Sequence, residues 1–128
     1  MLLSTFHCPV IIEHNGIIIF GGKADICRNS TIRCSGRLSI GNNAYINCNS
    51  FVSCNYFVNI GDDFLGGFNL HIQDCDSHKI FYENREKTNH DSIIIGNHVW
   101  CGANVDILKG AAIANGSILS FRSLDNMK

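Results

Sequence analysis

The sequence is poor in proline, in charge and in the residues that build long helices. Its 128 residues include one proline, and Asp, Glu, Lys and Arg make up 16% of them, against roughly 25% in typical soluble domains. The net charge is −1 and no basic stripe is visible, so nucleic-acid binding is not expected. Ile, Val, Phe and Tyr instead alternate with turn-forming Asn, Gly and Asp, which predicts many short strands. The length of the chain predicts one domain, residues 1–128.

Long apolar runs and a recognisable secretory signal are also missing. The run from Ile17 to Phe20 is far shorter than the about 20 residues of a membrane-spanning helix. Residues 1–5 lack the charged start of a signal, and Glu13 and His14 interrupt any apolar segment after it. We therefore expect a cytoplasmic protein with no integral membrane segment.

The chain has seven cysteines but no C-x-x-C pair. An odd number of cysteines without a secretory signal argues against a disulfide framework. A structural zinc site usually needs closely spaced ligand pairs, so no metal is expected. We predict reduced cysteines that pack as small apolar side chains.

A repeat of six residues runs through most of the chain. Large apolar residues recur at this spacing in four runs: Phe20, Ile26, Ile32 and Leu38; Ile40, Ile46, Val52 and Val58; Ile60, Gly66 and Ile72, weakened by its glycine; and Ile95, Cys101, Ile107, Ile113 and Leu119. A longer period of 20 separates Phe20, Ile40 and Ile60, each followed by Gly, while Ile95 and Ile113 lie 18 apart. Three hexapeptides make one unit of 18 residues, and two extra residues at one corner make 20.

A period of six fits neither an α-helix nor a simple alternating strand. It fits a short strand followed by a tight turn, with Gly and Asn where the turn needs unusual backbone angles. Three such units close a triangular coil whose apolar residues point inward, and coils stack about 4.8 Å apart through parallel strand pairing. The spacing predicts a parallel β-helix and leaves its hand open.

Ile93 to Ser120 reads IIIGNHVWCGANVDILKGAAIANGSILS. It resembles the run I-G-x-x-V-W-I-G-x-x-x-x-I-x-x-G-V-x-I-G-x-x-S-V-I of the hexapeptide-repeat acyltransferases. The matching residues are Ile95, Gly96, Val99, Trp100, Gly102, Ile107, Gly110, Ile113, Ser117 and Ile118. The resemblance covers roughly residues 17 to 122. It implies an all-β, left-handed parallel β-helix, and a homotrimer whose active sites form between neighbouring subunits.

The segment Asp74-Cys75-Asp76-Ser77-His78-Lys79-Ile80 resembles the D-x-D-x-H-x-I segment of the polysaccharide and sugar O-acetyltransferase branch. The repeat breaks after it, which predicts one extruded loop near residues 78–92. The resemblance implies transfer of an acetyl group from acetyl-CoA to a hydroxyl of a sugar or surface polysaccharide precursor. The acceptor itself, and nitrogen rather than oxygen as its reacting atom, stay open.

The resemblance implies that His78 is the general base for direct transfer, since imidazole ionises near neutral pH. Asp76, or Asp74, would orient it, by the logic of catalytic triads. Residues expected to meet the acceptor or acetyl region are Asn49, Asp74 and Trp100. Residues expected to hold acetyl-CoA are Trp100, Gly102, Ala103, Lys109 and Phe121.

Two alternatives remain. Ala114 stands where the family run has Gly, and Ser120 to Leu124 replaces the usual G-A-G-S-V. These departures favour a non-catalytic or degenerate β-helix, which would serve as a scaffold or binding protein with a truncated CoA site. A γ-type carbonic anhydrase would need three histidines on zinc; His71, His78 and His98 are available, but their spacing disfavours it.

Overall fold

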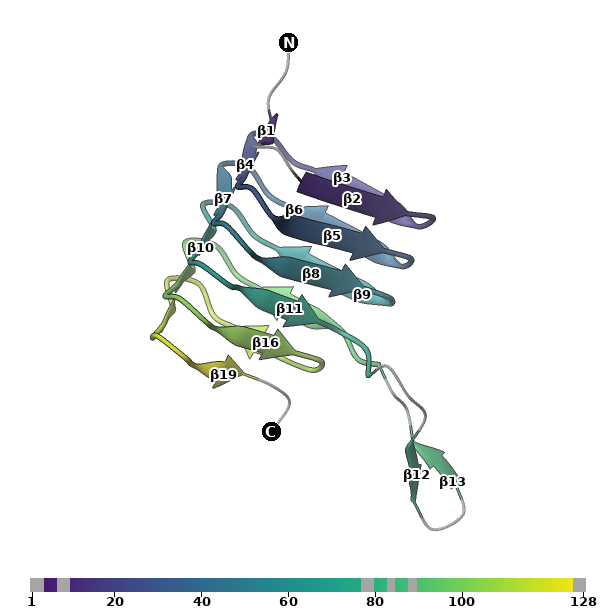
Figure 1. The fold of residues 1–128 in the computed structure, drawn as a ribbon. Coiled ribbons are helices and arrows are strands. Elements are labelled where there is room, and N and C mark those ends of the chain that lie inside the picture. The colour runs from purple at the N-terminus through teal and green to yellow at the C-terminus, as the bar shows by residue number, and fades with distance from the viewer. Residues whose placement is uncertain (1–3, 7–9, 77–79, 83–84, 88–89, 126–128) are drawn as a thin grey trace.

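The computed structural model describes residues 4–6, 10–76, 80–82, 85–87 and 90–125. Every regular element in these ranges is a β-strand of two to five residues. Apart from one antiparallel hairpin, the strands form three parallel sheets that line the sides of a stack of coils (Figure 1). This confirms the predicted all-β parallel β-helix, and the arrangement is consistent with the left-handed form.

We name the three sheets faces A, B and C, in the order in which each coil crosses them. Face A contains β1 (Ser4–Phe6), β4 (Ala24–Ile26), β7 (Ala44–Ile46), β10 (Leu65–Gly66), β15 (Trp100–Cys101) and β18 (Ile118–Leu119). Face B contains β2 (Val10–His14), β5 (Ser30–Cys34), β8 (Phe51–Cys54), β11 (His71–Gln73), β16 (Asp106–Leu108) and β19 (Leu124–Asp125). Face C contains β3 (Ile17–Phe20), β6 (Arg37–Ile40), β9 (Phe57–Ile60), β14 (Ile93–Ile95) and β17 (Ala112–Ile113).

The strand register reproduces the sequence period. Ile40 lies beside Ile60, and Ile60 lies beside Ile95 across the inserted loop. Ile95 then lies beside Ile113. The inserted segment contains an antiparallel hairpin, β12 (Ile80–Tyr82) with β13 (Arg85–Lys87), outside the stack of coils (Figure 1). The extruded loop expected near residues 78–92 is therefore confirmed.

Inward-pointing aliphatic side chains form one continuous core. Those with no exposed surface include Ile26, Leu38, Val58, Ile72, Ile93, Ile95 and Ile107. One coil departs from the pattern, because Gly66 takes the place that Ile46 holds in the coil before. The buried ring of Phe64 fills the space, and a Cβ on Gly66 would come within 3.1 Å of that ring and 2.7 Å of Leu70.

Asparagine and glycine hold most of the corner positions with positive φ, as the sequence predicted. Among the described residues these positions are Asn29, Asn43, Asn49, Asn69, Asn104, Gly110 and Gly116, together with Asp63, His98 and Arg122. At the corner between faces C and A, one side-chain oxygen per coil accepts a backbone N–H from the coil before, at 2.7 to 3.0 Å. The four residues of this ladder are Asn42, Asp62, Asn97 and Asn115. The ladder links the coils where no strand pairing exists.

Candidate functional site

The chain leaves the coils at the corner between β11 and β14, directly after the D-x-D pair. Cys75 forms an antiparallel bridge with His90, and the N–H of Asp91 donates to the backbone oxygen of Asp74 at 3.0 Å. The rings of His90 and Tyr56 pack with their centroids 4.5 Å apart. These contacts close the base of the extruded segment. His78, the predicted general base, lies outside the described residues.

Asp74 is fully buried, and its carboxylate binds backbone rather than solvent. It accepts N–H groups from Asn55 at 2.7 Å and from Tyr56 and Phe57 at 2.8 Å. One coil earlier the backbone oxygen of Cys54 accepts the two equivalent N–H groups of Ser35 and Gly36, and the N–H of Arg37 donates to the backbone oxygen of Tyr56. Because the chain departs after Asp74, its side chain replaces a backbone acceptor. This capping role was not predicted from the sequence.

Asp76 forms an ion pair with Lys109 from the next coil. The Lys109 ammonium donates to the Asp76 carboxylate at 2.7 Å, and both side chains are mostly shielded, with 20% and 32% of their surfaces exposed. The sequence assigned Asp76 to orienting the base and Lys109 to holding acetyl-CoA. The structure brings the two residues together at the base of the extruded segment.

A chain of polar side chains lies beside this pair on face B. Nδ1 of His71 is 3.4 Å from a carboxylate oxygen of Asp106, and Nε2 is 2.9 Å from the amide oxygen of Gln73. The amide nitrogen of Gln73 donates to the backbone oxygen of Cys75 at 2.6 Å. Sequence reasoning missed Gln73 and Asp106, because the pairing of residues 71 and 106 spans the inserted loop.

Trp100 points outward from face A, in register with Leu65 and Ile118. It is 52% exposed, and Leu65 and Ile118 are also exposed, so the three form an apolar row. Phe121, at the adjacent corner, is 59% exposed. Trp100 and Phe121, two of the residues expected to hold acetyl-CoA, therefore offer exposed apolar surface.

The backbone around Gly102 is already engaged. Its N–H donates to Leu119 at 2.8 Å, and a Cβ there would come within 3.0 Å of the Phe121 backbone nitrogen. The oxygen of Ala103 accepts the N–H of Arg122 at 2.9 Å. Gly102 thus permits close stacking of coils, and its amide is not free for a pantetheine contact.

Asn49 is exposed at the corner between faces A and B, with a φ of 62°. Its N–H donates to the backbone oxygen of Arg28 at 3.1 Å. Asn69 repeats this bond in the next coil by donating to Cys48. The turn therefore explains an asparagine at position 49, while its side chain stays exposed.

The predicted residues form two groups on different sides of the solenoid. Asp74, Asp76 and Lys109 gather at the corner between faces B and C. The second group, on face A and its corner with face B, comprises Trp100, Gly102, Ala103 and Phe121. The two groups are therefore not in contact within one copy of the chain.

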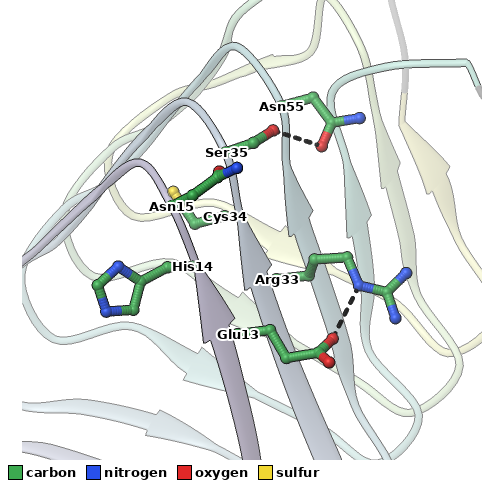
Figure 2. A pocket seen from close by; sticks show the side chains of 7 residues that line it. All are labelled: Glu13, His14, Asn15, Arg33, Cys34, Ser35 and Asn55. Atoms are coloured by element: carbon green, nitrogen blue, oxygen red, sulfur yellow. Dashed lines mark hydrogen bonds and ion pairs between the residues drawn. The ribbon is translucent and has the colours of Figure 1, made fainter.

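A separate depression of about 380 Å³ lies near the first coils, at the corner between faces B and C (Figure 2). Arg33 contacts Glu13 at 3.1 Å there, and the Ser35 hydroxyl donates to Asn55 at 3.2 Å. The remaining lining residues are His14, Asn15 and Cys34. It contains none of the predicted site residues.

Six cysteines lie within the described residues, and all are unbridged: Cys27, Cys34, Cys48, Cys54, Cys75 and Cys101. Burial raises the pKa of Cys101 to about 12. Burial, followed by the charge of Asp74, raises the pKa of Cys54 to about 12. The neutral thiol form, which is a poor nucleophile, is therefore favoured at both positions.

Within the described ranges, no group of three or more His, Cys, Asp and Glu side chains is arranged to hold a metal ion. The same part of the chain has no helix long and apolar enough to cross a membrane.

Comparison with known proteins finds a relative that matches part of the chain. The chain is 47% identical over 55 residues to a polysialic acid O-acetyltransferase of Neisseria meningitidis, and the match spans 41% of this chain and 26% of that protein. No family model matches the chain, and no solved structure gives a significant match. The partial match and the parallel β-solenoid together fit a hexapeptide-repeat acyltransferase.

Proposed function

We propose that the protein transfers an acetyl group from acetyl-CoA to a hydroxyl of a sugar or surface polysaccharide precursor. The observation that carries the proposal is the 47% identity to a polysialic acid O-acetyltransferase. The position of the D-x-D pair, Asp74 and Asp76, at the point where the chain leaves the coils, supports it. Loops that interrupt a solenoid commonly lie on its functional face.

In the proposed reaction His78 takes the proton of the acceptor hydroxyl as its oxygen attacks the acetyl carbonyl carbon. The tetrahedral intermediate then expels the CoA sulfur, which receives the proton from His78. Asp76 helps to orient the base, and Asp74 contributes indirectly, by holding the corner from which the segment departs. No cysteine is acylated, in keeping with the raised pKa values of Cys54 and Cys101.

The active unit is proposed to be a homotrimer. The residues at the base of the segment and the exposed Trp100 lie on different sides of one chain, so a neighbouring copy would supply the second group. The exposed row of Leu65, Trp100 and Ile118 gives apolar surface for the acetyl-CoA arm or a neighbour. Asn49 at its exposed corner is proposed to meet the acceptor.

Lys109 uses one N–H donor on Asp76, so it would meet a CoA phosphate with its remaining donors. Ala103 and Phe121 are the remaining proposed contacts for the CoA arm. A cytoplasmic location completes the proposal, since the six described cysteines are unbridged, as in a reducing compartment.

Calorimetric titration with acetyl-CoA tests the proposal against a non-catalytic scaffold. An acetyltransferase should bind acetyl-CoA with one site per chain, and should release CoA when polysialic acid or another capsular sugar is added. Absence of measurable binding at millimolar acetyl-CoA would favour the scaffold. Carbonic anhydrase activity would instead require bound zinc, which elemental analysis of the purified protein detects.

A further inference from the structure

Two polar connections join the coil of β16 to the last described residues before the extruded segment. The first runs from Asp106 through His71 and Gln73 to the backbone oxygen of Cys75, with successive distances of 3.4, 2.9 and 2.6 Å. The Gln73 amide nitrogen donates to Cys75, so the Gln73 amide oxygen faces the imidazole of His71. Each side chain in this connection therefore orients its neighbour.

The second connection is the ion pair between Lys109 and Asp76 at 2.7 Å. It starts one residue after β16 and ends one residue after Cys75. Both side chains are more shielded than those of the Arg33–Glu13 pair on face B, which are 58% and 57% exposed. Shielding from solvent makes a charged hydrogen bond more directional and less sensitive to salt.

A histidine–aspartate contact is not unusual by itself in this protein. His98 and Asp63 also approach to 3.4 Å, at an ordinary corner between coils. What distinguishes His71 is the continuation of the contact through Gln73 to Cys75, where the chain leaves the solenoid. The two connections thus hold consecutive residues, one by its backbone oxygen and one by its carboxylate.

We propose that His71 and Lys109 are positioning residues, which fix the direction in which the chain leaves the coils and so place the base that follows. The inference rests on the proposed function, because His78 is that base. It follows Asp76 by two residues, a span of at most about 7 Å of extended chain. Neither His71 nor Lys109 needs to touch a substrate; they act through Cys75 and Asp76.

The test compares His71→Phe with His98→Phe, and Lys109→Met with Lys109→Arg. Phenylalanine keeps the ring that lies 5.6 Å from Phe51 but removes both polar contacts of His71. Displacement of a base by about 1 Å can cost about 100-fold in rate. We expect His71→Phe and Lys109→Met to lower kcat roughly 10- to 100-fold, with unchanged thermal midpoints and an unchanged KM for acetyl-CoA. Lys109→Arg should keep most of the activity, and His98→Phe all of it.

Unchanged kcat in both variants, or an equal loss in His98→Phe, would overturn the proposal. So would a raised KM for acetyl-CoA with normal kcat in Lys109→Met, which would assign that residue to the CoA phosphates. A second readout is independent of catalysis: trypsin can cleave the segment after Lys79, Arg85 and Lys87. If the wild type transfers no acetyl group, the proposed function fails. Faster cleavage in His71→Phe and Lys109→Met would still establish the two connections, and equal cleavage would reject them.

Discussion

The carboxylate of Asp74 accepts the backbone N–H of Phe57 at 2.8 Å, across the gap left where the chain departs from the coils. The same carboxylate also binds the N–H groups of Asn55 and Tyr56. The Asp74 side chain thus supplies the hydrogen-bond acceptors that backbone oxygens supply at the same corner one coil earlier. The base of the extruded segment is anchored by a buried carboxylate whose partners, among the described residues, are backbone N–H groups.

We predict that Asp74→Asn destabilises the protein by about 2 kcal/mol, the usual range for hydrogen bonds to a charged group. An amide has one acceptor oxygen, so it cannot accept all three N–H groups and its nitrogen would face a donor. Urea unfolding measures the loss. Asp62→Asn is the control and should be nearly neutral, because Asn42, Asn97 and Asn115 make the same ladder contact. Equal stability of Asp74→Asn and wild type would refute the capping role.

Phe64 and Gly66 offer a second test, this one of core packing. Gly66→Ile should destabilise strongly, since even a Cβ would lie within 3.1 Å of the Phe64 ring. Phe64→Ala should cost about 3 to 5 kcal/mol by leaving a cavity. The double variant Phe64→Ala/Gly66→Ile has the same residues at these positions as the coil before, where they are Ala44 and Ile46. We expect it to recover at least half of the summed loss in the free energy of unfolding. Additive losses, measured by thermal unfolding, would mean that the two positions do not share one space.

The fold was predictable because the sequence repeats with the same period as the coils. Apolar residues six apart, with Asn and Gly between them, require a strand and a turn, and the 20-residue spacing of Ile40 and Ile60 became their register. The loop near residues 78–92 was predictable because the six-residue period fails there and resumes at Ile95. Gly66 was read only as a weak position, because its compensation by Phe64 depends on packing within the coil.

The candidate site was less predictable. Asp74 and Asp76 have the same side chain, two residues apart, yet one is buried against backbone and the other binds Lys109. Spacing cannot distinguish these environments. His71 contacts Asp106 because β11 pairs with β16 across the inserted loop. The length of this loop does not follow the repeat, so the spacing did not reveal the pairing. His78, which carries the proposed chemistry, stays a prediction.

The pKa values of the buried thiols predict a pH dependence of stability. Cys54 and Cys101 have a pKa raised from 9.0 to about 12 in the folded protein. Above about pH 8.5 the unfolded thiols lose protons that the folded ones keep, so the free energy of unfolding should fall with rising pH. Each thiol contributes at most about 1.4 kcal/mol per pH unit. Denaturation between pH 8 and 10 measures the slope, and Cys101→Ala should reduce it. A slope identical in this variant would contradict the assignment.

Trp100 is predicted to contribute to acetyl-CoA binding without supporting the fold. Trp100→Ala should weaken acetyl-CoA about 10-fold or more, because the indole is 52% exposed and offers a large apolar surface. Ile94→Ala is the control, since Ile94 is a comparably exposed apolar residue on face C. Calorimetry measures both affinities, and light scattering follows the assembly state. Equal acetyl-CoA affinity in the Trp100 and Ile94 variants would show that Trp100 does not contribute to acetyl-CoA binding.

The rate of acetyl transfer by His78→Ala tests the central claim most directly. The measurement follows acetyl-CoA consumption and the acetylated product by mass spectrometry, with polysialic acid and a panel of capsular sugars as acceptors. The account predicts that the wild type acetylates a sugar hydroxyl. It also predicts that His78→Ala is slower by about 10²- to 10⁴-fold, the usual contribution of a general base, while its acetyl-CoA affinity is retained. Transfer by His78→Ala at the wild-type rate would contradict the account.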